Sequence, residues 1–244
     1  MADLSKLFAL FIGLSVSTCT LAAAKSVPNF DARFETIQCE IPCKKPQKRI
    51  WWMLRNAAQV ELRDVNLPTG KLAKFSEIWR HQADNKLSYL FLMHERKRAI
   101  EYLPDDLKIL NISADEKQWQ IMTQLITDDE ISNLNKQSLK TVPYQRYQVE
   151  SYTGKINDVQ VSVLWLPQLR VPAKIVYFYP KTKVTVQLKQ LSTELASAIS
   201  TTESQLNSYQ QVYYTDIGDM EQNAEAQAWI IEAKGAPGLH THQH

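Results

Sequence analysis

The chain has 244 residues, with 28 Lys and Arg against 26 Asp and Glu, and a formal net charge of +2. This near-neutral balance gives no electrostatic case for nucleic-acid binding, which depends on a strongly basic surface. With six glycines, five histidines and no G-x-S-x-G motif, the sequence offers neither a phosphate-binding loop nor a nucleophile elbow. We therefore expect a protein without enzymatic activity.

The first 24 residues have the three regions of a secretory signal peptide. Lys6 supplies the positive charge, residues 7–21 are predominantly apolar, and three alanines at 22–24 form a small-residue cleavage site. The apolar run is shorter than the ~20 residues that a membrane-spanning helix needs. We expect export, cleavage after residue 24 and a soluble periplasmic protein.

Three cysteines bear on the compartment and on metal binding. Cys19 lies in a stretch that loosely resembles a bacterial lipobox, so anchoring through a lipid on Cys19 is the alternative to a free periplasmic protein. Cys39 and Cys43 remain after cleavage. Such a pair usually forms a disulfide in an oxidising compartment, whereas as thiolates it can bind a soft metal such as Cu(I).

Residues 30–110 have the patterning of β-strands. Val60 and Leu62 alternate with polar residues, and residues 87–93 are apolar on both faces, which predicts a strand covered on both sides. A basic run at residues 44–49 precedes Trp51 and Trp52. Basic residues beside aromatic ones suit peripheral contact with a membrane, but a solvated loop entering a buried strand is the simpler interpretation.

Helices are predicted in the middle and at the end of the chain. Residues 113–116 and 127–130 each match a capping box, and apolar residues follow with helical spacing. Strands return between residues 147 and 188. Residues 192–210 predict a polar helix or a linker, and a last helix is expected at about 220–233.

This order of elements predicts an α+β protein: a curved antiparallel sheet, or incomplete barrel, with helices covering one face. The ranges are a signal peptide at 1–24, a curved-sheet domain at 25–191 with a helical insert at 113–135, a helical C-terminal segment at 192–234, and a flexible histidine-containing tail at 235–244.

The signal peptide, the strand meander, the helix pair and residues 154–191 together resemble the periplasmic carrier of outer-membrane lipoproteins and its relatives. Within this part of the chain, Tyr-Thr-Gly-Lys at 152–155 leads into residues 163–167 and then into a strand at 184–188. The resemblance implies an apolar cavity between the sheet and the helices, where the family holds acyl chains. The expected partner is accordingly an apolar small molecule, a lipid or an envelope protein.

Large apolar side chains on the strands and on the first predicted helix are the candidates for lining this cavity. They are Trp79, Leu90, Leu92, Trp119, Met122, Val163 and Trp165. The predicted function is non-catalytic binding of an apolar ligand, such as lipid or lipoprotein acyl chains, or of a partner segment.

The alternative function is metal binding in the cell envelope. His240, His242 and His244 alternate in the predicted tail, where two or three imidazoles can close on one copper, nickel or zinc ion. The cysteine pair would add soft ligands. His81 and His94 are expected to be exposed on a hairpin.

Overall fold

The computed structural model describes residues 28–82, 86–138, 144–193, 199–220, 222–233 and 235–237. The predicted signal peptide with Cys19, and the candidate metal ligands His240, His242 and His244, lie outside the described residues.

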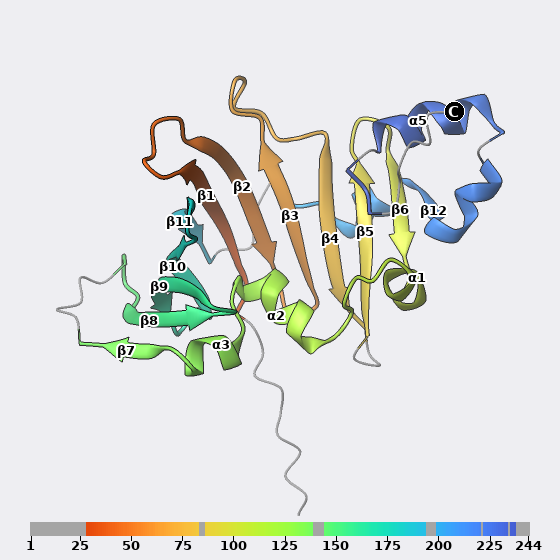
Figure 1. The fold of residues 1–244 in the computed structure, drawn as a ribbon. Coiled ribbons are helices and arrows are strands. Elements are labelled where there is room, and N and C mark those ends of the chain that lie inside the picture. The colour runs from red at the N-terminus through yellow and green to blue at the C-terminus, as the bar shows by residue number, and fades with distance from the viewer. Residues whose placement is uncertain are drawn as a thin grey trace, which may run out of the picture.

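Twelve strands of the described chain form one open sheet (Figure 1). They are β1 (Phe30–Glu40), β2 (Gln47–Arg55), β3 (Gln59–Val65), β4 (Phe75–His81), β5 (Leu87–Met93), β6 (Arg98–Tyr102), β7 (Asn135–Gln137), β8 (Glu150–Ile156), β9 (Val159–Leu166), β10 (Val171–Phe178), β11 (Thr182–Ser192) and β12 (Gln210–Tyr213). Their order in the sheet is β12-β6-β5-β4-β3-β2-β1-β11-β10-β9-β8-β7.

Two antiparallel meanders meet at β1. This strand pairs with β2 on one side and with β11 on the other, so the first and second halves of the chain share one ladder. The remaining neighbours follow the chain order, as short turns between antiparallel strands require. The exception is β12, which lies parallel to β6 at one edge of the sheet.

The helices are few and short. They are α1 (Pro104–Ile109), α2 (Glu116–Gln124), α3 (Asp128–Ser132), α4 (Glu203–Asn207) and α5 (Ala224–Glu232), with 3-10 turns η1 (Tyr214–Asp216) and η2 (Gly218–Met220). The predicted α+β class with helices covering one face is therefore wrong. Helices of at most nine residues can each bury only a turn or two of side chains, so the sheet dominates the fold. None of the described helices is long and apolar enough to cross a membrane.

Side-chain caps fix where these helices begin. The second predicted capping box is confirmed: Thr127 and Glu130 each accept the other's backbone amide, at 3.1 and 2.9 Å. The first is displaced, because Asp115 caps α2 and Ser113 donates to the Asp115 carboxylate instead. Likewise α5 starts after Asn223, four residues later than predicted.

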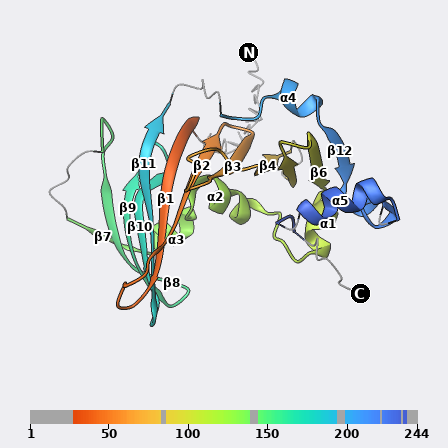
Figure 2. The same cartoon turned by 90° about the horizontal axis from the view of Figure 1, so that it is seen from above.

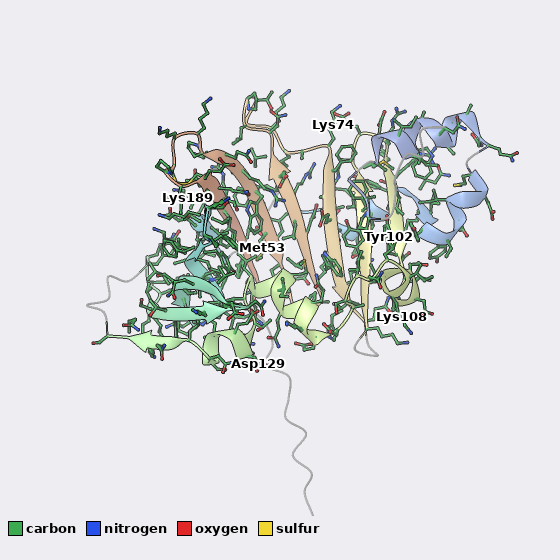
Figure 3. All side chains as sticks on the ribbon, viewed as in Figure 1. Met53, Lys74, Tyr102, Lys108, Asp129 and Lys189 are labelled. Atoms are coloured by element: carbon green, nitrogen blue, oxygen red, sulfur yellow. A yellow bond between two sulfur atoms is a disulfide. The ribbon has the colours of Figure 1, made fainter. Side chains whose placement is uncertain are left out.

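The sheet bends, and its two faces carry different packing (Figure 2). We call the side on which α2 lies the concave face and the side on which α4 lies the outer face. Most buried apolar side chains occupy the concave face, among them Met53 near the middle of the sheet and Tyr102 on β6 (Figure 3). A smaller cluster on the outer face packs against Leu206 of α4.

The C-terminal part adds to the sheet. The expected polar helix or linker at 192–210 contains α4 and the start of β12 in its described part. The beginning of the predicted flexible tail packs against the protein: Ala236 is buried, and the Tyr102 hydroxyl donates to the carbonyl of Pro237 at 2.8 Å. Residues 235–237 are thus part of the fold.

One buried arginine ties separate segments together. The Arg55 side chain is 1% exposed and donates to the carbonyls of Pro28, Thr123 and Leu169. Its guanidinium also lies over the ring of Phe30, 3.8 Å from the ring centroid. Burial lowers the pKa of Arg55 to about 8. The N-terminal segment, the end of α2 and the turn after β9 are therefore fastened to the end of β2.

Candidate functional site

The concave face has a hollow of about 200 Å³. Leu62 of β3, Phe75 and Glu77 of β4 and Phe91 of β5 line it, and Gly235 lies beside the Phe91 ring. The register Leu62↔Glu77↔Phe91 puts these side chains on one face of three neighbouring strands. We call this hollow the groove. Leu62 and Phe75 are only partly buried, so apolar surface remains available there.

Arg49 and Asp64 line the same groove and form an exposed ion pair at 2.7 Å. The Arg49 guanidinium also lies 5.6 Å from the ring of Trp51, which stacks on Phe34. One part of the groove is therefore charged, while the part near Phe75 is apolar.

Glu77 is the unusual group of the groove. Its carboxyl group is partly buried beside apolar side chains, and it makes no hydrogen bond within the described residues. Burial raises the pKa of Glu77, and the positive charge of Arg49 only partly opposes this shift. The groove thus disfavours a second negative charge and offers a hydrogen-bonding group to a ligand that enters it.

The seven side chains predicted to line a ligand cavity do not form one site. Trp79 lies in the large cluster of the concave face, together with Trp119 and the partly buried Met122 of α2. Val163 and Trp165 belong to a second cluster that packs against α3. These side chains fill the interior, and none of them lines the groove. Their role in ligand binding stays a prediction.

Leu90 and Leu92 are on the opposite side of the sheet from Trp79. Leu90 pairs with Ile78, and both leucines pack under Leu206 on the outer face. Strand periodicity correctly separates them from their neighbours on β5, but it does not say which face receives which cover. The groove instead uses Phe91, which lies between them in the sequence.

The basic run at 44–49 was open to two interpretations, contact with a membrane and a solvated loop that enters a buried strand, and each fits part of it. Lys48 pairs with Glu35, and Arg49 pairs with Asp64. Trp51 is buried and donates from Nε1 to Thr36, so it does not face solvent.

Both central histidines are less exposed than expected. The side chain of His81 is 24% exposed and packs against Trp119. That of His94 is 13% exposed and lies 2.9 Å from the Ser76 hydroxyl. The expectation of exposed histidines is therefore wrong. The residues that surround them on the folded sheet are distant in sequence, so the chain gives no local sign of their burial.

His94 belongs to a hydrogen-bonded network on the outer face. Ser76 donates to Glu61 at 2.7 Å, and the backbone and side chain of Thr201 both donate to the same carboxylate. Because the single Ser76 proton is used there, His94 Nε2 must donate to Ser76. Nδ1 then accepts from the Tyr209 hydroxyl at 2.8 Å.

This serine, histidine and glutamate do not have the geometry of a hydrolytic triad. In a triad the serine hydroxyl donates its hydrogen bond to histidine, whereas here the Ser76 hydroxyl donates to the Glu61 carboxylate. Burial and the nearby charge of Arg63 lower the pKa of His94 to about 4, which makes it a weak base. Ser76 is only 3% exposed. The network fastens residues 199–209 to the sheet.

The cysteine pair is a disulfide, as predicted: Cys39 is bonded to Cys43. Such a bond is typical of exported proteins. In this oxidised state the two sulfurs are not thiolates, so they do not offer the Cu(I) ligands of the alternative function. Among the residues that the structure describes, no three His, Cys, Asp or Glu side chains are grouped to hold a metal ion. Copper, nickel or zinc binding by the three tail histidines stays a prediction.

No family model matches the sequence, and no curated protein matches it. Solved structures show low similarity. PNGF-II has a TM-score of 0.40 at 11% identity over 80% of this chain and 34% of its own, so the chain spans about a third of that protein. A DUF1329 family protein from Desulfovibrio piger gives 0.33 at 7% identity, over 75% and 92%. An outer membrane lipoprotein-sorting protein domain from Vibrio parahaemolyticus gives 0.27 at 8%, over 74% and 89%. These values describe a weak architectural resemblance and carry no conclusion about function.

Sequence reasoning missed the residues that distinguish the groove and the outer-face network. Glu77 and Glu61 occupy alternate strand positions whose polar character predicts exposure, yet both are wholly or partly buried. The available signal is that Ser76 and Glu77 stand between large apolar residues at 75 and 78–79. That pattern suggests a strand with cover on both faces.

Proposed function

We propose that this protein is an exported, non-catalytic binding protein of the periplasm that holds part of an acyl chain in the groove. The observation that carries the proposal is Glu77, a carboxyl group without a hydrogen-bond partner in the described structure, set between the partly uncovered Leu62 and Phe75. The Glu77 oxygens are not fully buried, so they are open to the groove and can accept from a donor that enters it. A ligand would cover the two apolar side chains and complete the bonding of the carboxyl group.

The chemistry of the groove selects among acyl ligands. A free fatty acid would bring its carboxylate toward Glu77, and two such groups in a desolvated site repel each other. An ester- or amide-linked acyl chain is uncharged and avoids this repulsion, and a hydroxyl or amide N–H beside the linkage can donate to the Glu77 carboxylate. The expected ligand is therefore an acylated lipid or lipoprotein. The volume of about 200 Å³ is below the usual range of small-molecule pockets, so it would hold only a segment of the chain.

A fluorescence titration with a pyrene-labelled monoacylglycerol tests this proposal. We expect saturable binding to the wild-type protein and binding at least about tenfold weaker for Leu62→Glu, which puts a second carboxylate on the apolar surface of the groove. Leu67→Glu is the matched control, because Leu67 is 45% exposed and does not line the groove. A pyrene-labelled fatty acid of the same length should bind more weakly than the monoacylglycerol.

Circular dichroism spectra should show that both variants keep the wild-type fold. Equal affinity of the two variants for the monoacylglycerol would contradict the groove as the binding site. Absence of binding to the wild-type protein would contradict the function.

A further inference from the structure

Two hairpin ends lie side by side at one margin of the sheet (Figure 2). Residues 41–46 join β1 to β2, and residues 179–181 join β10 to β11. The Ile41 amide donates to the Lys181 carbonyl at 2.9 Å, and the Cys39–Cys43 disulfide closes the first turn. We call residues 41–46 and 178–183 together the tip surface. The two turns thus form one connected surface.

Large apolar side chains are exposed on this surface. Ile41 is 54% exposed, and Phe178 and Tyr179 are each 40% exposed. Only eight large apolar side chains are this exposed among the described residues, and three of them lie on the tip surface. Their grouping is what an interaction surface requires, because scattered single exposures are ordinary.

Unpaired cations surround these apolar side chains. Lys44, Lys45 and Lys181 are exposed and have no carboxylate partner in the described part of the chain. Lys183 lies with its Nζ 5.6 Å from the ring of Phe178. Glu40 is the acidic residue beside them, so the lysines outnumber acidic groups by four to one. The partner that fits this charge is anionic.

The tip surface also has room for polar groups of a partner. A hollow of about 530 Å³ is lined by residues 38–42, 44, 45, 47 and 182, and it includes both Lys44 and Lys45. A second hollow of about 590 Å³ lies beside Tyr179, Pro180 and Lys181. Groups as large as lipid phosphates can therefore reach the lysines without displacing protein.

We propose that the tip surface docks on an anionic lipid bilayer. The lysine ammonium groups would lie at the level of the lipid phosphates, while Ile41, Phe178 and Tyr179 enter the boundary between headgroups and acyl chains. A soluble polyanion would use the lysines but would leave the three apolar side chains in water. This combination favours a bilayer. The docking does not depend on the groove, so it stands apart from the proposed function.

Vesicle co-sedimentation tests the proposal. The full mature protein is mixed with phosphatidylcholine vesicles that contain about 30% phosphatidylglycerol, and in parallel with pure phosphatidylcholine vesicles. We expect binding to the anionic vesicles and little to the neutral ones. The triple substitution K44E, K45E and K181E reverses three charges and should weaken vesicle binding at least about 100-fold, because each lysine near an anionic surface contributes about fivefold to the affinity.

The matched control reverses the charge of the exposed Lys71, Lys108 and Lys117, which changes the net charge equally and lies outside the tip surface. We expect this control to lose less than about fivefold. A second variant, Ile41→Ser with Tyr179→Ser, should keep binding at low salt and lose it at about 0.5 M salt, where wild type retains part of it.

Three outcomes would overturn the proposal. The first is equal loss of binding in the two lysine variants. The second is equal binding of wild type to neutral and anionic vesicles. The third is binding to heparin, a soluble polyanion, with no binding to anionic vesicles. That result would mean that the lysines bind a soluble polyanion and not a bilayer. Leu62→Glu should bind vesicles as wild type does, so failure of docking and failure of the groove are separable.

Discussion

At the scale of single residues, Arg55 has the most concentrated structural role. A buried guanidinium usually faces a carboxylate, but Arg55 donates to backbone carbonyls from three separate parts of the chain. Its charge is accommodated by these carbonyl dipoles and by the face of Phe30. The Arg55 side chain thus acts as a junction that holds three separate segments of the chain together.

Replacing Arg55 by alanine should therefore lower the free energy of unfolding by about 3 kcal/mol or more, because buried carbonyls lose their donors and a cavity opens over Phe30. Urea denaturation measures the change. Arg49→Ala is the comparison, since its exposed ion pair with Asp64 should be worth less than about 1 kcal/mol. A loss at Arg55 no larger than the loss at Arg49 would contradict its role as a junction.

The sequence carries no sign of this role, although it predicts much that is local. The cap at Thr127 and Glu130, the strand that contains Val60 and the disulfide can be predicted, because each depends on residues close together in the chain. The partners of Arg55 lie up to 115 residues away. Glu77 is likewise placed in the groove by strand pairing and by Gly235.

At the scale of elements, the segment from residue 199 through β12 acts as a strap across the outer face. The Glu61 carboxylate accepts from Thr201 at its start, and Tyr209 donates to His94 near its end. Between them, Leu206 packs on the outer-face leucines. The segment was predicted as a polar helix or a linker, because the parallel pairing of β12 with β6 joins residues more than 100 positions apart.

This strap should make stability depend on pH through His94. The pKa is about 4 in the folded protein and about 6.5 in an unfolded chain. Between these values the unfolded chain binds a proton that the folded protein does not. The contribution of neutral His94 to the free energy of unfolding is therefore fully present above about pH 6.5. It is lost as the pH falls toward 4, by up to about 3 kcal/mol.

Urea denaturation of wild type and His94→Gln between pH 7 and pH 4 measures this dependence. The variant should lose less stability than wild type over the interval. A slope that is the same in His94→Gln and wild type would contradict the assignment.

At the scale of the whole molecule, one open sheet carries two separate surfaces. The groove lies on the concave face across β3, β4 and β5, and the tip surface lies at the ends of the β1–β2 and β10–β11 hairpins. Arg49 lies on β2 between them, just after the first turn and at the charged part of the groove. Docking of the tip on a membrane would hold the groove near a source of acylated lipids.

The tip surface depends on the pairing of β1 with β11, which brings the two hairpins together. Alternation predicts most of the antiparallel strands, but it misses β7 and β12, and the joining of two meanders is a long-range event. The helices were overestimated for a related reason. The ends of helices are marked by local sequence signals, whereas the extent of the sheet that the helices would cover has no local signal in the sequence.

The most direct test of the account is a native mass spectrum of the mature protein purified from its own envelope without detergent or chelator. We expect an added mass in the range of an acylated lipid, which is lost on denaturation and absent from Leu62→Glu but present in Leu67→Glu. A bare protein mass, a metal-sized addition, or a lipid retained by Leu62→Glu would contradict it.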